Sequence, residues 1–471
     1  MFEPLYDAAE MRAAEEQYPG YPDTIPELMQ RAGRAVAREA MAAFPRARRF
    51  ACVCGSGSNG GDGRVAAAAL REAGHAVDET AELDGYDVVV DALFGTGFHG
   101  APRSEAADLI ARIDAADAKV VSVDLPSGVD ASTGEVAGAV VDADLTVTFH
   151  GRKVGLVVGP GRFHAGKVVV SDIGLPARET EHARATRDLL ALVPRRGARD
   201  SKYSSGSVLV VGGQPGMTGA ACLSALAALR SDAGYVTLAV PARSLSTAES
   251  LALEPVKVGW RDETALRTIA AAAERARALA IGPGLGRSTK RRSLVRELLE
   301  RIDLPAVVDA DALFGLEPVA RRAPTVLTPH AGELARLLDT DPAWVAAHRL
   351  EAARTAADRF RAVVLLKGAD TIVARPGEGC IVCDLGPPSL ATAGTGDVLT
   401  GVVASFLAKG LDAHVAAAAA ALACATAARP DSPSPRMPAW RGRGSRSTSA
   451  RSAATHRRSC VRRTAPSSGR S

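Results

Sequence analysis

Clusters of glycine and polar residues follow several apolar runs in the first half of this 471-residue chain. The segment GSGSNGGDG (55–63) is expected to form a loop between a strand and a helix, and it contains the spacing G-x-G-x-x-G. Asn59 and Asp62 add polar groups that a plain dinucleotide loop lacks. Glycine N–H groups at a helix start bind phosphate, although the same spacing is also typical of a tight strand-to-helix turn. The side chains of Asn59, Asp91 and Ser127 offer oxygen atoms that suit a hard cation. Taken singly, each of these residues is also a common turn former.

The most informative segment of the second half is ATAGTGDVLTGVVASFLA (391–408). Its glycines would present free N–H groups at a helix start, where they stabilise the charge of a transferred phosphoryl group. Asp397 could accept the proton of an attacking hydroxyl, although an Asp at this place is also a common helix N-cap. Lys367, in LLKGADT, could meet a nucleotide phosphate, and no Walker motif occurs. The pattern favours phosphoryl transfer outside the P-loop class.

Further polar groups of the second half also follow apolar runs. The acids Asp309 and Asp311 end the run VVDAD, and His330 stands before a predicted helix that carries Glu333. Taken alone, His330 is as typical of a capping or packing histidine as of a ligand contact.

These groups must be positioned by buried strands that alternate with Ala/Leu-rich helices. Runs with little alternation indicate strands covered on both faces, as in a doubly wound parallel sheet. Ligands bind at the carboxyl ends of such strands, so the polar clusters of each half are expected to converge. A polar, charged stretch near 195–205 predicts a boundary between two α/β domains. The predicted strands lie in the runs 49–54, 86–94, 119–126, 144–149, 207–213, 235–240, 278–284, 305–313, 325–330 and 362–368.

The net charge of +4 arises in the last segment of the chain. Residues 430–471 hold ten Arg, ten Ser and one acid, and removing them leaves 47 basic against 52 acidic residues. The remainder lacks the basic stripe of a nucleic-acid-binding protein. The Ser/Arg composition predicts a disordered tail, and a frameshifted ending explains it better than a nucleic-acid-binding tail.

The cysteines and the apolar segments predict a cytoplasmic protein without a membrane span. Seven scattered cysteines indicate free thiols, and Cys380 and Cys383 are expected to be buried strand residues rather than a zinc or redox pair. The acidic N-terminus is unlike a signal peptide, and the apolar run 415–428 is too short for a bilayer.

The first half resembles the NAD(P)H-hydrate epimerase family, on the motifs LMQRAGRAVA, GSGSNGGDG, DALFGTGF, SVDLPSGVDASTG and GRKVGL. The resemblance covers about residues 1–190 and implies interconversion of the R and S forms of hydrated NAD(P)H, with Asp124 as the acid/base group. It also implies that Asn59, Asp91 and Ser127 hold K⁺. Ser58 departs from the Asn that is usual in the family. The implied hydrate contacts are Ser58, Asn59, Gly60, Gly61, Asp62, Gly95, Thr96, Gly97, Phe98, His99, Gly100, Ala101 and Asp124.

The second half resembles the ADP-dependent NAD(P)H-hydrate dehydratases, which have a ribokinase-like fold. The matching motifs are GGQPGMTGAA, GPGLG, DADAL, TPHAGELARLL, KGADT and AGTGDVLTG. The resemblance implies phosphorylation of the ring hydroxyl, with Asp397 as the base, and then elimination of phosphate. Magnesium is expected to bridge the phosphates. The implied hydrate contacts are Ala220, Gly286, His330 and Asp397, and the implied nucleotide contacts are Lys367, Gly368, Ala369, Asp370, Thr371 and Gly396.

The predicted fold class is therefore α/β with two doubly wound domains, a Rossmann-like three-layer sandwich (1–198) and a ribokinase-like domain (199–429), followed by the tail (430–471). The predicted enzyme is a homo-oligomer that acts on hydrated NADH or NADPH and on ADP, and binds neither nucleic acid nor membrane. The tail replaces a helix of the family, so weakened dehydratase activity is expected. Two alternatives remain: a vitamin-precursor kinase fused to a Rossmann-like regulator, and a binding scaffold without activity.

Overall fold

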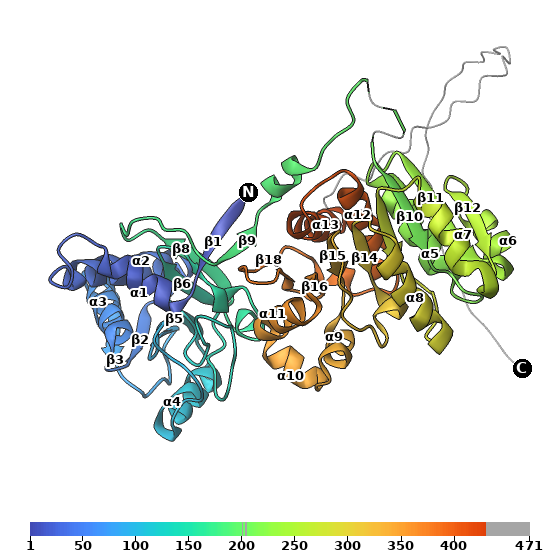
Figure 1. Cartoon of the computed structure of the whole chain (residues 1–471). Helices are drawn as coiled ribbons and strands as arrows, with labels where there is room; N and C mark the ends of the chain where they lie inside the picture. The colour runs from blue at the N-terminus through green and yellow to red at the C-terminus, as the bar shows by residue number, and fades with distance from the viewer. Residues whose placement is uncertain (200, 203–204, 430–471) are drawn as a thin grey trace, which may run out of the picture. The chain divides into compact units, whose positions relative to one another are not determined.

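The computed structural model describes residues 1–199, 201–202 and 205–429 (Figure 1). The predicted disordered tail, 430–471, lies outside the described residues. Each apolar run that the sequence marks as a strand contains one. Within the described residues, no helix is both long and apolar enough to cross a lipid bilayer.

The first sheet has six parallel strands with a doubly wound order, β3-β2-β4-β5-β6-β8. Val88 and Val90 pack on one face of this sheet, and Val89 between them packs on the other. The strands are thus buried on both sides, which explains their continuous apolar sequence. The strands are β2 (Arg49–Cys54), β3 (Ala76–Glu79), β4 (Val88–Ala92), β5 (Lys119–Val123), β6 (Leu145–Phe149) and β8 (Lys167–Ser171).

Helices cover both faces of the first sheet, which makes three layers. One face packs against α1 (Ala8–Glu16), α2 (Ile25–Ala43) and α3 (Ser58–Glu72), and the other against α4 (Ser104–Ala115). The topology of the sheet reverses between β2 and β4, so a crevice is expected at their carboxyl ends.

The second sheet continues this design with the order β12-β11-β10-β13-β14-β15-β16-β17-β18 and then the short strands β9, β1 and β7. The strands from β12 to β16 are parallel, whereas β17 and β18 pair antiparallel. The strands are β10 (Ser207–Val211), β11 (Tyr235–Pro241), β12 (Val256–Trp260), β13 (Ala278–Ile281), β14 (Ala306–Val308), β15 (Thr325–Leu327), β16 (Val363–Leu366), β17 (Thr371–Ala374), β18 (Ile381–Cys383), β1 (Phe2–Tyr6), β7 (Arg152–Lys153) and β9 (His182–Ala185).

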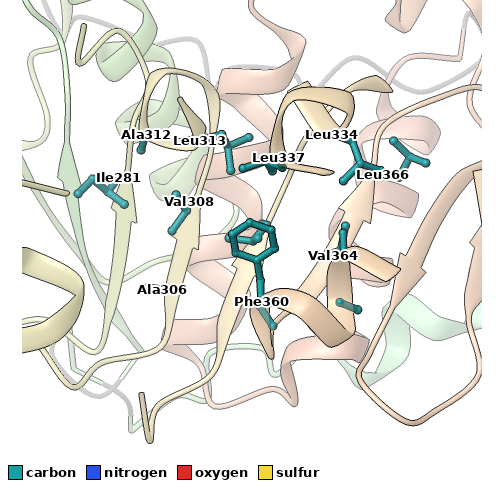
Figure 2. Packing of buried hydrophobic residues seen from close by; sticks show 14 of the residues in the cluster. Ile281, Ala306, Val308, Ala312, Leu313, Leu334, Leu337, Phe360, Val364 and Leu366 are labelled. Atoms are coloured by element: carbon teal, nitrogen blue, oxygen red, sulfur yellow. The ribbon is translucent and has the colours of Figure 1, made fainter. Parts of the chain in front are cut away.

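Two hydrophobic clusters sandwich the second sheet. Figure 2 shows part of one of them, in which Ile281, Val308 and Val364 of the sheet meet Phe360 and Leu337 of two helices. This face carries α7 (Ala265–Ala273), α8 (Thr289–Arg301), α9 (Ala331–Leu338), α10 (Pro342–Ala347) and α11 (Arg349–Phe360). The other carries α5 (Thr218–Arg230), α6 (Leu245–Leu251), α12 (Thr395–Ala408) and α13 (Ala413–Ala427).

Two local expectations have clear outcomes. The glycine-rich segment 55–63 is not a loop throughout, because α3 already begins at Ser58. A methyl group on Gly60 would lie 1.9 Å from the carbonyl oxygen of Gly55, so the missing side chain lets the helix close onto the end of β2. The expectation for Cys380 and Cys383 is confirmed, since both are buried free thiols at β18.

Candidate active sites

The first site lies where β2, β4 and β5 end, in the crevice that the reversal of the sheet topology predicts. Asp91 is fully buried at the end of β4. Asp91 accepts hydrogen bonds from the Oγ and the N–H of Ser127 at 2.6 and 2.9 Å, and from the Oγ of Ser122 at 2.8 Å. Burial raises the pKa of Asp91, and the hydrogen bonds from Ser127 and Ser122 oppose that rise.

The three residues implied as cation ligands lie together in this crevice. The N–H of Phe94 donates to the Oγ of Ser127 at 3.0 Å, and the Nδ2 of Asn59 donates to the carbonyl oxygen of Phe94 at 2.8 Å. Asn59, Ser127 and Asp91 are therefore joined through one loop residue. Gly95 follows directly, and a methyl group there would press on Asn59 at 3.2 Å.

Asp124 begins the turn after β5, with a left-handed backbone (φ 68°) and 7 % exposure. A non-glycine residue in this conformation is strained, and such strain gathers at functional sites. The Oδ1 of Asp124 accepts hydrogen bonds from Lys153 and, at 3.0 Å, from Thr148. Among the described residues no donor contacts Oδ2 of Asp124, so this oxygen is free to meet a ligand.

Asp62 lies in the first turns of α3 and interacts electrostatically with Asp124 and Glu15. Burial, with the negative charges of Asp124 and Glu15, raises the pKa of Asp62 to about 8. Burial and the charge of Asp124 also raise the pKa of Glu15. Asp62 is therefore protonated at neutral pH and can give up a proton.

The remaining residues implied as hydrate contacts in this half lie on the turn after β4 and at the start of α3. Phe98 stacks on Phe94 with ring centroids 4.6 Å apart, and the Nδ1 of His99 lies 2.7 Å from Asp130. Asp130 also accepts from the N–H groups of Ser132 and Thr133, so it organises its own turn. Thr96, Gly97, Gly100 and Ala101 complete this turn, and Ser58 and Gly61 lie at the start of α3.

The second site lies in the crevice that is expected at the carboxyl ends of parallel strands, here β13, β14, β15 and β16, beside the N-terminus of α12. Asp397 stands in the first turn of α12, behind Gly394 with its left-handed backbone. The Oγ of Ser224 on α5 donates to the carbonyl oxygen of Asp397 at 2.7 Å, which ties the two helices together. Burial and the charge of Asp309 raise the pKa of Asp397 to about 6, against the opposing charge of Lys367.

Lys367 follows β16 directly at this edge of the sheet. Its Nζ lies 2.9 Å from the Oδ1 of Asp309 and 3.6 Å from the Oε2 of Glu333. Burial disfavours the ammonium ion, but the attraction of Asp309 and Glu333 outweighs it, so the pKa of Lys367 is raised. A methyl group on Gly396 would lie 3.5 Å from this Nζ, so Lys367 and the start of α12 share one space.

The other predicted site residues of the second half differ in their hydrogen-bond partners and in their exposure. His330 caps α9: its Nδ1 accepts from the N–H groups of Gly332 and Glu333, and burial lowers its pKa. Gly286 donates its N–H to Asp311 at 2.9 Å. Asp370 is buried and accepts from Nε of Arg349 at 2.8 Å, so its carboxylate serves the fold. Gly368 and Ala369 are exposed, the Oγ1 of Thr371 donates to the carbonyl oxygen of Gly368, and Ala220 lies in the first turn of α5.

Three residues in the crevices received no role from the sequence. Lys153 and Thr148 hold Asp124, and Thr400 on α12 donates to Asp309. The one signal for Lys153 is a lysine within the largely apolar stretch GRKVGL.

Comparisons with known proteins define the class of this chain as an enzyme that acts on hydrated NAD(P)H. A family model described as NAD(P)H-hydrate dehydratase matches residues 208–435, and one described as YjeF-related protein N-terminus matches residues 26–82 and 77–155. The two helix-covered sheets confirm the predicted α/β fold class with two doubly wound halves.

Curated relatives match across both halves. The bifunctional NAD(P)H-hydrate repair enzyme of Moorella thermoacetica is 40 % identical over 79 % of this chain and 81 % of its own length. The enzyme of the same name from Escherichia coli is 34 % identical over 86 % of this chain and 85 % of its own. This chain therefore belongs to the family of bifunctional NAD(P)H-hydrate repair enzymes, with an epimerase and a dehydratase half.

A solved structure resembles the second half. The ADP/ATP-dependent NAD(P)H-hydrate dehydratase from Bacillus subtilis, co-crystallised with ATP/Mg²⁺, is 32 % identical and covers 51 % of this chain and 86 % of its own, with a TM-score of 0.46.

Proposed function

We propose that this chain repairs hydrated nicotinamide coenzymes in two steps. The epimerase half interconverts the R and S hydrates of NADH and NADPH. The dehydratase half converts the S form to NAD(P)H and splits ADP into AMP and phosphate. The vitamin-precursor kinase alternative is not supported, because curated relatives matching both halves are repair enzymes. We assign the epimerase half to residues 1–198 and the dehydratase half to 199–429.

The observation that carries the dehydratase step is Asp397 in the first turn of α12, behind the glycine-rich turn. In our proposal the ring hydroxyl attacks the β-phosphorus of ADP and gives its proton to Asp397, and AMP leaves. The N–H groups at the helix start stabilise the charge on the transferred group. Phosphate then leaves with a ring proton, which restores the double bond of NAD(P)H. The pKa of about 6 keeps Asp397 ionised, and so able to accept a proton, at neutral pH.

In the epimerase half we assign acid/base work to Asp124. Oδ1 of Asp124 is held by Lys153 and Thr148, and Oδ2 faces no donor among the described residues. A fixed carboxylate with one open oxygen can take the proton of the ring hydroxyl while the bond from the hydroxylated carbon to the ring nitrogen breaks and leaves a carbonyl group. The proton returns to that oxygen when the bond re-forms on the other face, which inverts the carbon. We assign the hydrate contacts to the start of α3 and the turn at 95–101.

The residues beside Asp124 fit a potassium ion. Asn59 offers Oδ1, Ser127 offers Oγ and Asp91 offers a charged carboxylate. The three side chains are joined through Phe94. Such hard oxygen donors are those that bind hard cations. When bound, K⁺ would supply a fixed positive charge near the substrate phosphates. In the protein itself, Asn59 of α3 is hydrogen-bonded to Phe94, which holds the turn after β4 against α3.

In the dehydratase half we expect Mg²⁺ to be held by the nucleotide phosphates, beside an ammonium group and oxygen donors. The nucleotide would lie along Lys367, Gly368, Ala369, Asp370, Thr371 and Gly396, and the hydrate against Ala220, Gly286, His330 and Asp397. We further propose a cytoplasmic homo-oligomer that acts on small molecules, without nucleic acid or membrane as a partner.

The experiment that tests the proposed function uses the full chain and a mixture of R and S hydrated NADH. With ADP, Mg²⁺ and K⁺, the absorbance of NADH at 340 nm should return until both forms are consumed. With Asp124→Asn, the absorbance should stop rising once the S form is consumed. With Asp397→Asn, the absorbance should not rise. No return of absorbance with the unmodified chain contradicts the dehydratase assignment. Asp124→Asn consuming both forms at the normal rate contradicts the epimerase assignment.

A further inference from the structure

Asp309 lies at the end of β14 and is 1 % exposed, so both of its oxygens need partners. Oδ1 accepts from Nζ of Lys367 at 2.9 Å, and Oδ2 accepts from Oγ1 of Thr400 at 2.8 Å. These two partners come from different elements, since Lys367 follows β16 and Thr400 belongs to α12. One carboxylate therefore connects the ends of two strands with a helix.

Thr400 lies three residues beyond Asp397 on α12, which places it one turn further along the same side of the helix. Its Oγ1 also lies 3.1 Å from the carbonyl oxygen of Gly396. A methyl group on Gly396 would come within 3.9 Å of Oδ2 of Asp309, so the helix start and the carboxylate are in close proximity. The hydrogen bond between Thr400 and Asp309 therefore restrains the helical turn that carries Asp397.

A buried ion pair can exist for folding alone, and such pairs contribute little net stability. The link from Asp309 to Thr400 is different, because it fixes the helix relative to Lys367. A displacement of about 1 Å at a catalytic group can cost a hundredfold in rate. The same contact therefore has a functional consequence that a purely structural ion pair lacks.

We propose that Asp309 is a positioning residue of the dehydratase site, which joins Lys367 to Thr400 and so fixes the direction in which Asp397 faces the substrate hydroxyl. This inference rests on the proposed dehydratase activity and deepens it. Asp309 touches neither hydrate nor nucleotide in this scheme.

The charge of Asp309 gives the proposal a second readout. Charged groups reach Asp397 from two sides: Asp309 and Asp311 follow β14 and raise the pKa of Asp397, whereas Lys367 follows β16 and lowers it. Glu333 on α9 forms an ion pair with Lys367. Removing the charge of Asp309 therefore removes one cause of the raised pKa. The acid limb of kcat/KM, expected near pH 6, should move to lower pH.

The test separates contact from charge by two variants of the full chain. Thr400→Val removes the hydrogen bond and leaves the charge, so kcat/KM of the dehydratase should fall roughly ten- to hundredfold without a shift of the acid limb. Thr400→Ser should restore the rate. Asp309→Asn keeps the shape and removes the charge, so the acid limb should shift.

Internal controls come from the same molecule. Asp339→Asn makes the same charge change at an exposed site and should leave the dehydratase rate and the acid limb unchanged. Epimerase activity should stay unchanged in all four variants, which checks folding of that half. Tryptophan fluorescence checks the second half, because Trp260 and Trp344 both lie in it.

An unchanged dehydratase rate in Thr400→Val overturns the proposal, and so does an unshifted acid limb in Asp309→Asn. In both cases turnover by the unmodified chain still supports the proposed function. If Asp309→Asn fails to fold, the Thr400 pair decides by loss and rescue. An unmodified chain without turnover overturns the proposed function and the inference with it.

Discussion

The ammonium group of Lys153 donates a hydrogen bond to Oδ1 of Asp124, and the Lys153 side chain is fully buried. Lys153 also donates to Oγ1 of Thr148 at 3.0 Å and to the carbonyl oxygen of Phe149 at 2.9 Å. All three N–H bonds of the lysine are thus used inside the protein. Because Lys153 and Thr148 hold Oδ1 of Asp124, they also restrict the orientation of its second oxygen.

Lys153→Met should therefore harm both the stability and the activity of the epimerase half. Removing one partner of a buried pair leaves an uncompensated charge, which costs about 3–5 kcal/mol. Epimerase kcat should fall at least about a hundredfold, because the carboxylate loses its fixed direction. Urea unfolding and an assay of R-to-S conversion measure the two effects.

The matched variant is Thr148→Val, which keeps the charge of Lys153 but removes the hydrogen bond from Thr148 to Asp124 and the one from Lys153 to Thr148. Its loss of stability should be smaller, about 1–2 kcal/mol. An epimerase rate in Lys153→Met equal to that of the unmodified chain would contradict the role of the lysine.

Asp62 should make the stability of the epimerase half depend on pH. Burial, with Asp124 and Glu15, raises its pKa to about 8, whereas the unfolded chain loses this proton near pH 4. Between these values the native state binds more protons, so the free energy of unfolding falls as pH rises. Asp62→Asn lacks this effect, and its stability relative to the unmodified chain should increase from pH 5 to pH 8, by at most about 1.4 kcal/mol per unit.

Native-state hydrogen exchange of the amides in α3 measures this difference in the full chain. Asp108→Asn is the control, because Asp108 is an exposed residue of α4. The difference for Asp108→Asn should not change with pH. A flat difference for Asp62→Asn as well would show that Asp62 is ionised in the native protein.

The meeting of Asn59, Asp91 and Ser127 could be predicted from the sequence, and the position of Lys153 could not. The first follows from one rule, since parallel strands bring their carboxyl ends to one edge of a sheet. Lys153 pairs with Asp124, which lies 29 residues before it in the sequence. No local sequence pattern distinguishes a lysine that will be buried. The same applies to Thr400, whose acceptor Asp309 lies 91 residues before it.

The start of α3 shows why local composition misled at the glycine-rich segment. Five glycines in segment 55–63, together with Asn59 and Asp62, are typical of a loop, because glycine disfavours a helix. The helix forms there because Gly60 packs directly on the backbone of Gly55, a contact that only the tertiary structure creates. His330 shows a related limit: the sequence allowed a cap or a ligand contact, and the structure shows the capping hydrogen bonds.

The pair Cys380 and Cys383 should be chemically inert. Burial raises the pKa of both thiols to about 12, so almost no thiolate exists at pH 8. Iodoacetamide should leave both cysteines unmodified in the native chain and alkylate them in concentrated urea, as peptide mass spectrometry can show. Rapid alkylation of native Cys380 or Cys383, or protection by zinc in urea, would contradict their role as core residues.

Gly60 and Gly57 form a matched pair at the start of α3. A methyl group on Gly60 would lie 1.9 Å from the carbonyl oxygen of Gly55, whereas one on Gly57 would meet no atom within 4 Å. Gly57 also has φ −86°, which alanine adopts readily. Gly60→Ala should cost roughly 1–3 kcal/mol and displace Asn59 and Asp62, so epimerase activity should be lost.

Gly57→Ala should change stability by less than about 1 kcal/mol and keep most of the epimerase rate, because it changes only the residue that caps α3. Hydrogen exchange of α3 and the R-to-S assay measure both variants, and dehydratase activity in the same chains should be unchanged. Equal losses in the two variants would mean that the segment needs glycine for flexibility. A selective loss in Gly60→Ala would mean that the close approach of α3 to β2 builds the crevice.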